Sequence, residues 1–317
     1  MTEKTAKKPR YSGRIAQTAI YVGKFFRMFV YQSDWKVLPI GAVIAAIVTF
    51  VTGTYMFVTQ EGTTTGTFAL TCACVWNGFF NSIQVVCRER EIVKREHRAG
   101  LHVSAYIAAH MLYQLFLCFM QTLVTIGILR VANIQIPAKG VITPWGIVDV
   151  GITILLVTYA ADMMALMVSC VVRTTTAAMT AMPFLLIFQL VFSGGFFDLA
   201  GPAEKVKYAT ISHWGMDALS AIGRFNEQPM VTLWNTLVTF KNVEVYGERP
   251  LLKILIETEQ RGSREEFLRW SGSYTMKTAY EATISNVASY WLALLFLLLL
   301  FAVVAVIALK FIDRDKR

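Results

Sequence analysis

Charged residues are scarce in this sequence. Aspartate, glutamate, lysine and arginine make up 16% of its 317 residues, whereas soluble domains average about a quarter. Hydrophobic residues make up 55% and the mean hydropathy is +0.50. This balance excludes an ordinary soluble domain and predicts a protein with most of its length in a membrane.

Signatures of catalysis are also missing. No G-x-x-x-x-G-K-[ST] motif occurs, so these residues supply no P-loop and we expect no cofactor in this chain. The four histidines do not converge in sequence. His213 and Asp217 are spaced i,i+4, which suits a structural pair better than a metal site without a third ligand. We therefore expect no catalytic and no metal site, and a protein that is not an enzyme.

Cysteine is absent from residues 198–281. The five cysteines lie in or beside apolar stretches, which excludes a domain in 198–281 that its own disulfides would hold together. We interpret them as small packing residues. They are Cys72, Cys74, Cys87, Cys118 and Cys170.

Long apolar stretches are what the sequence has instead. About 20 helical residues cross the hydrocarbon core of a bilayer, and the sequence offers six such stretches. They are Val37–Val58, Gly62–Cys87, and segments within Ala99–Leu129, Val141–Val172, Thr174–Phe197 and Ala282–Leu309. The sequence thus predicts an all-α polytopic membrane protein with six transmembrane helices. Its parts are residues 1–36, spans one to five in 37–197, an extracellular segment 198–281, and span six with the tail in 282–317.

Lysine and arginine are distributed unevenly between the loops. Residues 1–36 hold eight, the loop after the second stretch holds five, and the loop between the first two stretches holds none. Because cytoplasmic loops carry the excess, we expect a multi-pass plasma-membrane protein with both termini in the cytoplasm. We attribute the net charge of +9 to this bias and to contact with membrane lipids, and not to nucleic acid.

The segment Arg10–Tyr31 has the pattern of an amphipathic helix. One face is polar and another apolar, which is typical of a helix in the membrane interface. It can be a simple anchor or a lever toward a cytoplasmic partner. The polar face holds Arg10, Arg14, Gln17, Tyr21 and Lys24, and the apolar face Ile15, Ala19, Val22, Phe26 and Phe29.

The densest charge lies in Arg88–Arg98, between the second and third stretches. Eight of its eleven residues are charged. We expect a short helix along the cytoplasmic surface, with Glu91 and Arg95 paired at i,i+4. A topogenic positive loop would explain the basic residues, but not the three interleaved glutamates. We therefore predict a helix that docks a soluble partner.

Polar side chains recur inside the spans. Unpaired polar groups are costly in lipid, so these side chains either bond neighbouring helices or line a water-filled path. The positions are Asn77, Asn81 and Gln84 as one stripe, Gln114 and Gln121 on one face, and Asp149 and Asp162. In the fifth stretch Phe184, Phe188 and Phe192 form an aromatic stripe beside Gln189, for which packing is the simpler explanation.

Residues 198–281 are too long for a linker. They contain 21 charged residues and several short periodic segments. Thr232–Val245 suits either a strand or a helix, and Ser263 with Glu266 fits a capping box. The other predicted helices are Glu204–Tyr208, Met216–Arg224 and Leu251–Thr258. We expect a small mixed lid.

Together, the order of these parts resembles the membrane domain of ATP-binding-cassette exporters of the G subfamily, the white and pleiotropic-drug-resistance type. The motifs that carry the resemblance are short: Glu89–Arg90, Arg95–Glu96, Gly100 and Tyr106, then Phe192–Phe197 and Ile211–Leu219. The nucleotide-binding domain usually fused in that family and the cysteines of its external loop are missing, which resembles a bacterial permease served by a separate ATPase chain.

The resemblance implies a homodimeric translocation path powered by ATP and Mg²⁺ in that ATPase. It implies that Arg88–Arg98 is the coupling helix, with Arg90, Glu91, Lys94, Arg95 and Glu96 at the ATPase. On the same basis, Asn77, Asn81, Gln84, Phe184, Phe188 and Phe192 are expected to line the path. A secondary transporter or channel subunit is the alternative, although no internal repeat is visible. A membrane enzyme would need convergent polar residues.

Overall fold

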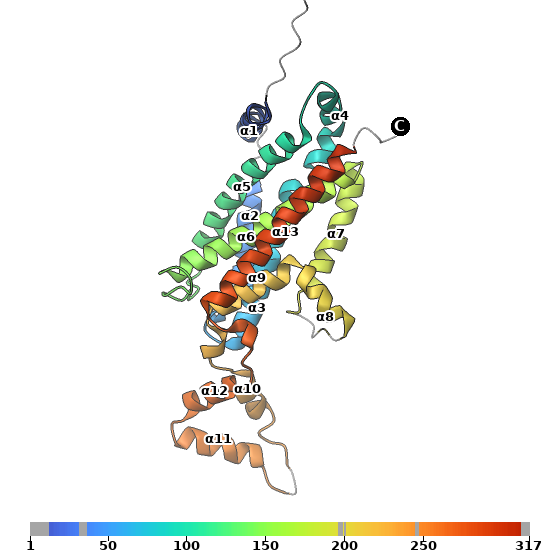
Figure 1. The fold of residues 1–317 in the computed structure, drawn as a ribbon. Helices are drawn as coiled ribbons and strands as arrows, with labels where there is room; N and C mark the ends of the chain where they lie inside the picture. Colours follow the sequence, from blue (N-terminus) through green and yellow to red (C-terminus); the bar gives the residue numbers. More distant parts are fainter. Residues whose placement is uncertain (1–12, 32–36, 196–198, 200, 245–246, 312–317) are drawn as a thin grey trace, which may run out of the picture.

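The computed structural model describes residues 13–31, 37–195, 199, 201–244 and 247–311. Every regular element within these residues is a helix, and none is a strand (Figure 1). The all-α prediction is therefore confirmed for the described part of the chain. Arg10, Phe196 and Phe197, which the sequence analysis singled out, lie outside the described residues.

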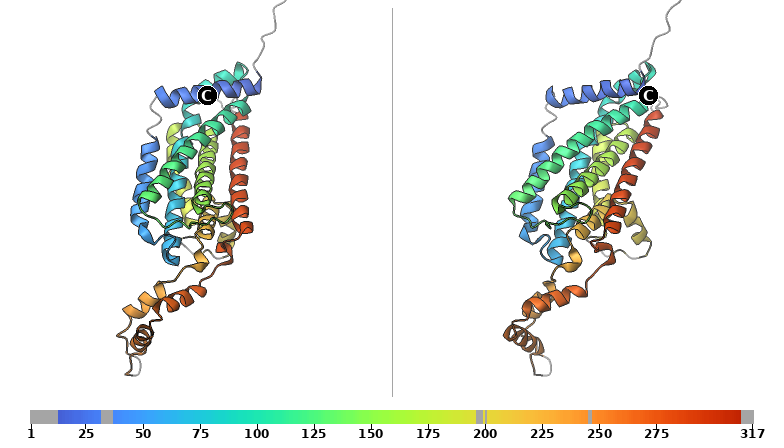
Figure 2. Two further views of the ribbon diagram at one scale, coloured as in Figure 1. Left: turned by 90° about the vertical axis from the view of Figure 1, so that its left-hand side faces the viewer. Right: turned by 60° about the vertical axis from the view of Figure 1, so that its left-hand side comes forward.

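Six apolar helices run along one bundle (Figures 1 and 2). Four of them, α3 being counted with the continuing α4, are long and apolar enough to cross a membrane, whereas α2 and α7 have only 16 and 17 residues. All six overlap the stretches predicted from the sequence. They are α2 (Val37–Thr52), α3 (Gln60–Ser82), α5 (Val103–Val131), α6 (Gly146–Val171), α7 (Thr175–Val191) and α13 (Ile284–Lys310).

Small residues allow the central helices to touch. α6 packs against both α3 and α13. A Cβ atom on Gly78 of α3 would lie 2.3 Å from the carbonyl oxygen of Thr158 on α6. Only glycine therefore fits at this crossing, which is how helices approach closely where lipid supplies little hydrophobic drive for association. Ala160, Ala161 and Ala165 of α6 are fully buried.

One end of the bundle carries α1 (Arg14–Tyr31), α4 (Val85–Arg98) and the C-terminal end of α13. α1 lies across the bundle axis instead of along it (Figure 2), as an interfacial helix would. We call this the basic end. The N-terminal helix and the charged helix thus share one end, in agreement with the lysine and arginine pattern.

The opposite, distal end holds most of residues 198–281. α9 (Ile211–Ile222) packs against α3, α6 and α13, and the short α8 (Pro202–Val206) precedes it in the chain. Three helices project from the bundle: α10 (Thr232–Thr239), α11 (Pro250–Gln260) and α12 (Arg264–Ser273) (Figures 1 and 2). The first part of Thr232–Val245 is therefore a helix, and the described part of this segment shows helices where a mixed lid was predicted.

Two local predictions are wrong. Ser263 precedes α12, but its hydroxyl donates to the carbonyl of Thr258 instead of accepting from the first turn of α12. The capping box is absent because the turn at Gly262 folds Ser263 back under α11. Gln84 does not continue the stripe of α3, since α3 ends at Ser82 and Gln84 is the N-cap of α4.

Candidate functional site

The charged helix α4 is fixed to α6 through its first turn. The amides of Val86 and Cys87 donate to the hydroxyl of Ser169, at 3.0 and 3.1 Å, and so find the partners that helix starts lack. In return, Arg90 donates to the carbonyls of Cys170 and Val172 at 3.0 and 3.1 Å. The start of α4 and the end of α6 therefore satisfy each other's free backbone groups and form one rigid corner.

α1 is bound to α4 by two polar contacts. The Lys24 ammonium lies 3.2 Å from the carboxylate of Glu89, whose side chain is mostly buried, and the Tyr21 hydroxyl donates to Glu96. Burial and the nearby Glu96 raise the pKa of Tyr21 well above its usual range, so this hydroxyl keeps its proton. Gln17 adds a third contact, because its amide bridges the Gly100 carbonyl and the His102 amide.

Both faces of α1 contact the protein: Phe26 and Phe29 of the apolar face pack on Phe116 of α5, and the polar face meets α4. Gln17, Tyr21 and Lys24 all point to α4 or to the turn after it. Ile15, predicted on an apolar face, is 88% exposed and available to lipid. The pattern predicted an amphipathic helix correctly, but the polar groups bond to the free carbonyls and carboxylates of the neighbouring helix instead of to water.

The remaining face of α4 is free in the protomer. Val93 is fully buried, whereas Glu91, Ile92 and Arg95 are exposed. Within the described residues no ion pair joins Glu91 to Arg95, so the predicted i,i+4 pair is wrong. Both side chains stay in solvent, where a surface ion pair gains little. Lys94 lies at the edge of this face.

The predicted path residues of α3 face the interior of the protomer. Asn77 is buried beside Gly41 of α2. Asn81 is buried and exchanges two hydrogen bonds with Gln121 of α5, both 3.0 Å long. Gln114 similarly donates to Ser82 at 2.8 Å. Of the two sequence interpretations, interhelical bonding is what the Asn81 contact shows, and a role for these residues in a path stays a prediction.

The predicted aromatic stripe lies on α7 and on Phe192, the residue that caps its C-terminal end. Phe184 is 70% exposed, and the rings of Phe188 and Phe192 stack with centroids 5.0 Å apart. The stripe is therefore available for contacts outside the protomer. Gln189, beside it in sequence, is buried and accepts three hydrogen bonds from the start of α9.

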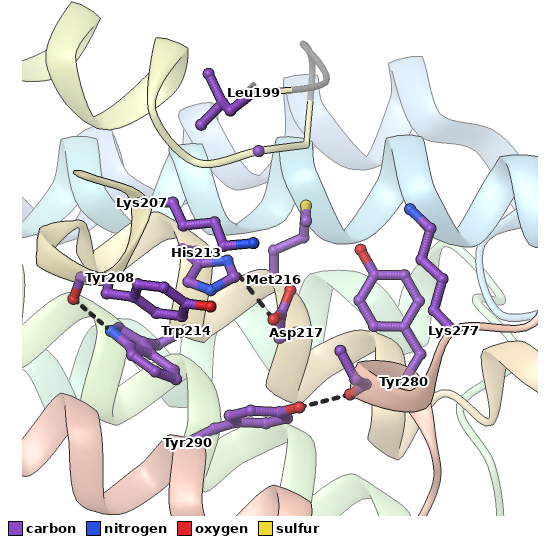
Figure 3. Close-up of a pocket in the computed structure, with 12 residues that line it drawn as sticks. Leu199, Lys207, Tyr208, His213, Trp214, Met216, Asp217, Lys277, Tyr280 and Tyr290 are labelled. Atoms are coloured by element: carbon purple, nitrogen blue, oxygen red, sulfur yellow. Dashed lines mark hydrogen bonds and ion pairs between the residues drawn. The ribbon is translucent and has the colours of Figure 1, made fainter. Parts of the chain in front are cut away.

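A cavity of about 380 Å³ opens at the distal end, beside α9 and α13 (Figure 3). The imidazole of His213 and the carboxylate of Asp217 lie 3.6 Å apart inside it, consistent with the predicted structural pair. Among the described residues, no third metal ligand joins them. Besides this pair, the lining includes Lys207, Tyr208, Trp214, Lys277, Tyr280 and Tyr290.

Burial controls the charge of the His213–Asp217 pair. It raises the pKa of Asp217 to about 7 and lowers that of His213 to about 4. Lys207 adds to the second shift by repelling an imidazolium. Near neutral pH the imidazole is therefore uncharged, so the contact is not an ion pair, and the carboxyl changes its charge around pH 7.

Sequence reasoning missed the residues that join the helices. Ser169, Gln17 and Gln189 each satisfy the backbone of another element. A polar side chain in an apolar or amphipathic segment needs a hydrogen-bond partner, and this was the available signal. Which backbone group it contacts, however, depends on how the helices cross. No local pattern contains that information.

Comparison with known proteins gives two matches. The profile of the ABC-2 type transporter family matches residues 21–222, which is more than half of the chain. The ABC transporter ATP-binding/permease protein Rv1747 of Mycobacterium tuberculosis is 27% identical over 159 residues. The match covers 48% of this chain and 18% of that protein, so the chain corresponds to less than a fifth of the relative's length.

Proposed function

Because the chain belongs to the ABC-2 type transporter family, we propose that it is the membrane-spanning permease subunit of an ATP-driven exporter of the white or pleiotropic-drug-resistance type. Family membership and the apolar helices make it a membrane protein and a transport subunit, not a catalytic one. The further proposal is export from the cytoplasm through a homodimer powered by a separate ATPase.

The observation that carries this proposal is the division of α4 into two faces. One face is locked to α6 through Ser169 and Arg90. The other presents Glu91, Ile92 and Arg95 to solvent. Ile92 is 40% exposed among charged side chains, and an apolar centre with a charged rim is the usual composition of a protein interface.

An ATPase docked on this face would act on the whole bundle. A displacement of α4 reaches α6 through the corner at Ser169 and Arg90, and α6 packs on α3 and α13. It also reaches α1 through Lys24 and the Glu89 carboxylate. The 317 residues contain no P-loop, so ATP and Mg²⁺ are proposed to bind in the ATPase.

The same proposal sets the arrangement in the membrane. α2 and α7, although short, would join the four longer helices as six spans, with the basic end in the cytoplasm and the distal end outside. Support comes from the lysine and arginine bias and from the shared end of α1, α4 and the last turn of α13. Phe184, Phe188 and Phe192 would line the path between two copies, with Asn77 and Asn81 nearer the protomer interior.

The test replaces two exposed residues of α4, Glu91 and Ile92, with alanine. The double variant Glu91→Ala/Ile92→Ala, reconstituted with its ATPase in liposomes, should lose most of the transport-coupled ATP hydrolysis while inserting normally. The matched control is Ile256→Ala/Glu257→Ala, an exposed isoleucine and glutamate on α11 at the distal end. Equal rates of transport-coupled ATP hydrolysis in the two variants would show that α4 serves only to set the topology and does not dock the ATPase.

Glu96 tests a different step of the same mechanism. Its carboxylate is bound to the Tyr21 hydroxyl, so it belongs to the contact between α1 and α4 and not to the docking face. Glu96→Ala should leave the ATPase bound but lower the coupling of hydrolysis to transport. Tyr21→Phe, which removes only the hydroxyl, should reproduce that effect.

A further inference from the structure

We propose that the distal pocket binds the phosphate-bearing headgroup of an anionic lipid, held between Lys207 and Lys277 over the aromatic side chains of α9 and α13. On the orientation proposed above, on which this inference rests, that lipid belongs to the outer leaflet. At about 380 Å³ the cavity falls within the range of small-ligand sites. It is large enough for a phosphate and its glycerol but not for the acyl chains.

The two lysines bring positive charge to the pocket that the protomer neutralises only in part. Lys277 lies 5.1 Å above the ring of Tyr280; among the described residues it acts on the Asp217 carboxyl electrostatically without forming a direct ion pair. Lys207 lies 5.2 Å above the ring of Tyr208. Its contact with the exposed carboxylate of Glu204 is 3.4 Å long, and such surface pairs are weak.

The lysines come from different segments of the chain and meet at the same cavity. Figure 3 shows Asp217 between Lys207 and Lys277. The two ammonium groups lie on the same face of the pocket. Lys207 follows α8, and Lys277 precedes the start of α13. Two ammonium groups around one opening attract a group with several negative oxygens more than a neutral ligand.

The aromatic side chains place the pocket at headgroup depth. Tyr290 lies in the second turn of α13, whose remaining length runs through the bundle. Trp214 packs 6.0 Å from it and donates its indole N–H to the carbonyl of Tyr208 at 2.9 Å. Tryptophan and tyrosine concentrate where the hydrocarbon meets the headgroups. A lipid there can place its phosphate in the pocket and keep its chains along α13.

Asp217 makes the site sensitive to pH. The charged and titratable groups around it are Glu204 in α8, Lys207 and Tyr208 after α8, His213 on α9, Lys277 and Tyr280 before α13, and Tyr290 on α13. Burial raises the pKa of Asp217 to about 7, whereas His213 stays neutral above pH 5. As the pH falls from 8 to 6 the carboxylate is neutralised, and its repulsion of a phosphate disappears.

The test is native mass spectrometry of the purified full chain in detergent, titrated with phosphatidylglycerol or phosphatidylcholine. We expect phosphatidylglycerol to bind at least tenfold more tightly, and Lys207→Gln/Lys277→Gln to abolish that preference. The matched control is Lys205→Gln/Lys241→Gln, two exposed lysines that do not line the pocket. Lys207→Arg/Lys277→Arg keeps the charge and should retain binding, which separates lost charge from misfolding.

Glycerol 3-phosphate and inorganic phosphate identify the source of the anion. A lipid site should bind phosphatidylglycerol far more tightly than either soluble probe, because the chains add contacts along α13. Equal binding of glycerol 3-phosphate would assign the pocket to a soluble phosphate ester and overturn the lipid proposal. Equal phosphatidylglycerol binding by wild type and Lys207→Gln/Lys277→Gln would overturn the site itself. Neither result depends on an ATPase or on orientation, so failure of the exporter proposal would be seen separately.

Discussion

The side-chain carbonyl of Gln189 accepts a hydrogen bond from the amide of Ile211 at 2.8 Å. It also accepts from the amide and hydroxyl of Ser212, at 3.2 and 3.1 Å. Gln189 belongs to α7 and is almost completely buried, whereas Ile211 and Ser212 begin α9. The apolar helix α7 therefore joins the N-cap residue Thr210 in capping α9, a helix that lines the distal pocket.

Replacing Gln189 with leucine should destabilise the protein. The first-turn amides of a helix have no partner within it, and a buried donor left without an acceptor costs about 1–3 kcal/mol. We expect Gln189→Leu to lower the free energy of unfolding by roughly 2–4 kcal/mol, measured as a lower melting temperature in detergent. Leu190→Ala, an exposed neighbour on α7, is the control. Equal melting of the two variants would contradict the assigned cap.

Asp217 should make stability depend on pH. Burial raises its pKa to about 7, and the unfolded value is about 3.9. The carboxyl therefore contributes stability at low pH that is lost as the pH rises from about 4 to 7. The stability difference between wild type and Asp217→Asn should fall over this range by up to about 4 kcal/mol, at about 1.4 kcal/mol per pKa unit.

His213 should have the opposite effect on stability. Burial lowers its pKa to about 4, so its contribution is lost as the pH falls from about 6.5 to 4. Comparing Asp217→Asn and His213→Asn separately with wild type distinguishes the pH dependence that each group contributes. A pH-independent difference for Asp217→Asn, measured by thermal unfolding from pH 4 to 8, would show that this carboxyl is solvated.

The Asn81–Gln121 pair should act as a bond between α3 and α5. Its two hydrogen bonds are both 3.0 Å long, and interhelical hydrogen bonds in membrane proteins average about 0.6 kcal/mol and reach about 1.7 kcal/mol. A double-mutant cycle with Asn81→Leu and Gln121→Leu should give a coupling energy of about 1 kcal/mol. A coupling near zero, with transport lost in Asn81→Leu alone, would instead favour a path residue.

The sequence predicted the helices well but not their contacts. Hydrophobic runs gave all six apolar helices, because burial in lipid depends on composition over about 20 residues. The density of charged residues predicted the helix α4. It did not predict that Glu89 would pair with Lys24, or that Glu91 and Arg95 would remain apart. Those outcomes depend on which face of α4 meets α1 and α6, a property of the whole packing. The predicted place of Gln84 on the stripe is wrong because α3 ends at Ser82 and Gln84 is the N-cap of the next helix, α4.

Labelling should establish the orientation of the bundle. With the five native cysteines replaced, a cysteine at Arg261, exposed in the turn after α11, should react with an impermeant thiol reagent in intact cells. A cysteine at Arg95, exposed on α4, should react only after permeabilisation. The reason is the excess of lysine and arginine at the basic end. The reverse pattern would place the docking face outside and refute an ATPase partner there.

A second copy of the chain should pack against α7. Phe184 is 70% exposed on this helix, and a two-fold axis would let the stripe of α7 meet its own copy. Asn81, in contrast, is bonded to Gln121 inside the protomer and should not reach a partner. A single cysteine at Phe184, in the background without native thiols, should therefore crosslink between copies with a short bifunctional reagent, whereas one at Asn81 should not.

Phe296 provides the control for this crosslink. It is 65% exposed on α13, almost as much as Phe184, and the same substitution there places a cysteine on a helix that the proposed dimer leaves in lipid. Crosslinking at Phe184 but not at Phe296, and a change in its yield when the ATPase binds ATP, are the expected results. Equal yields at both positions would indicate random collision in the membrane. A monomer by native mass measurement, with no crosslink at Phe184, would rule out the homodimeric path.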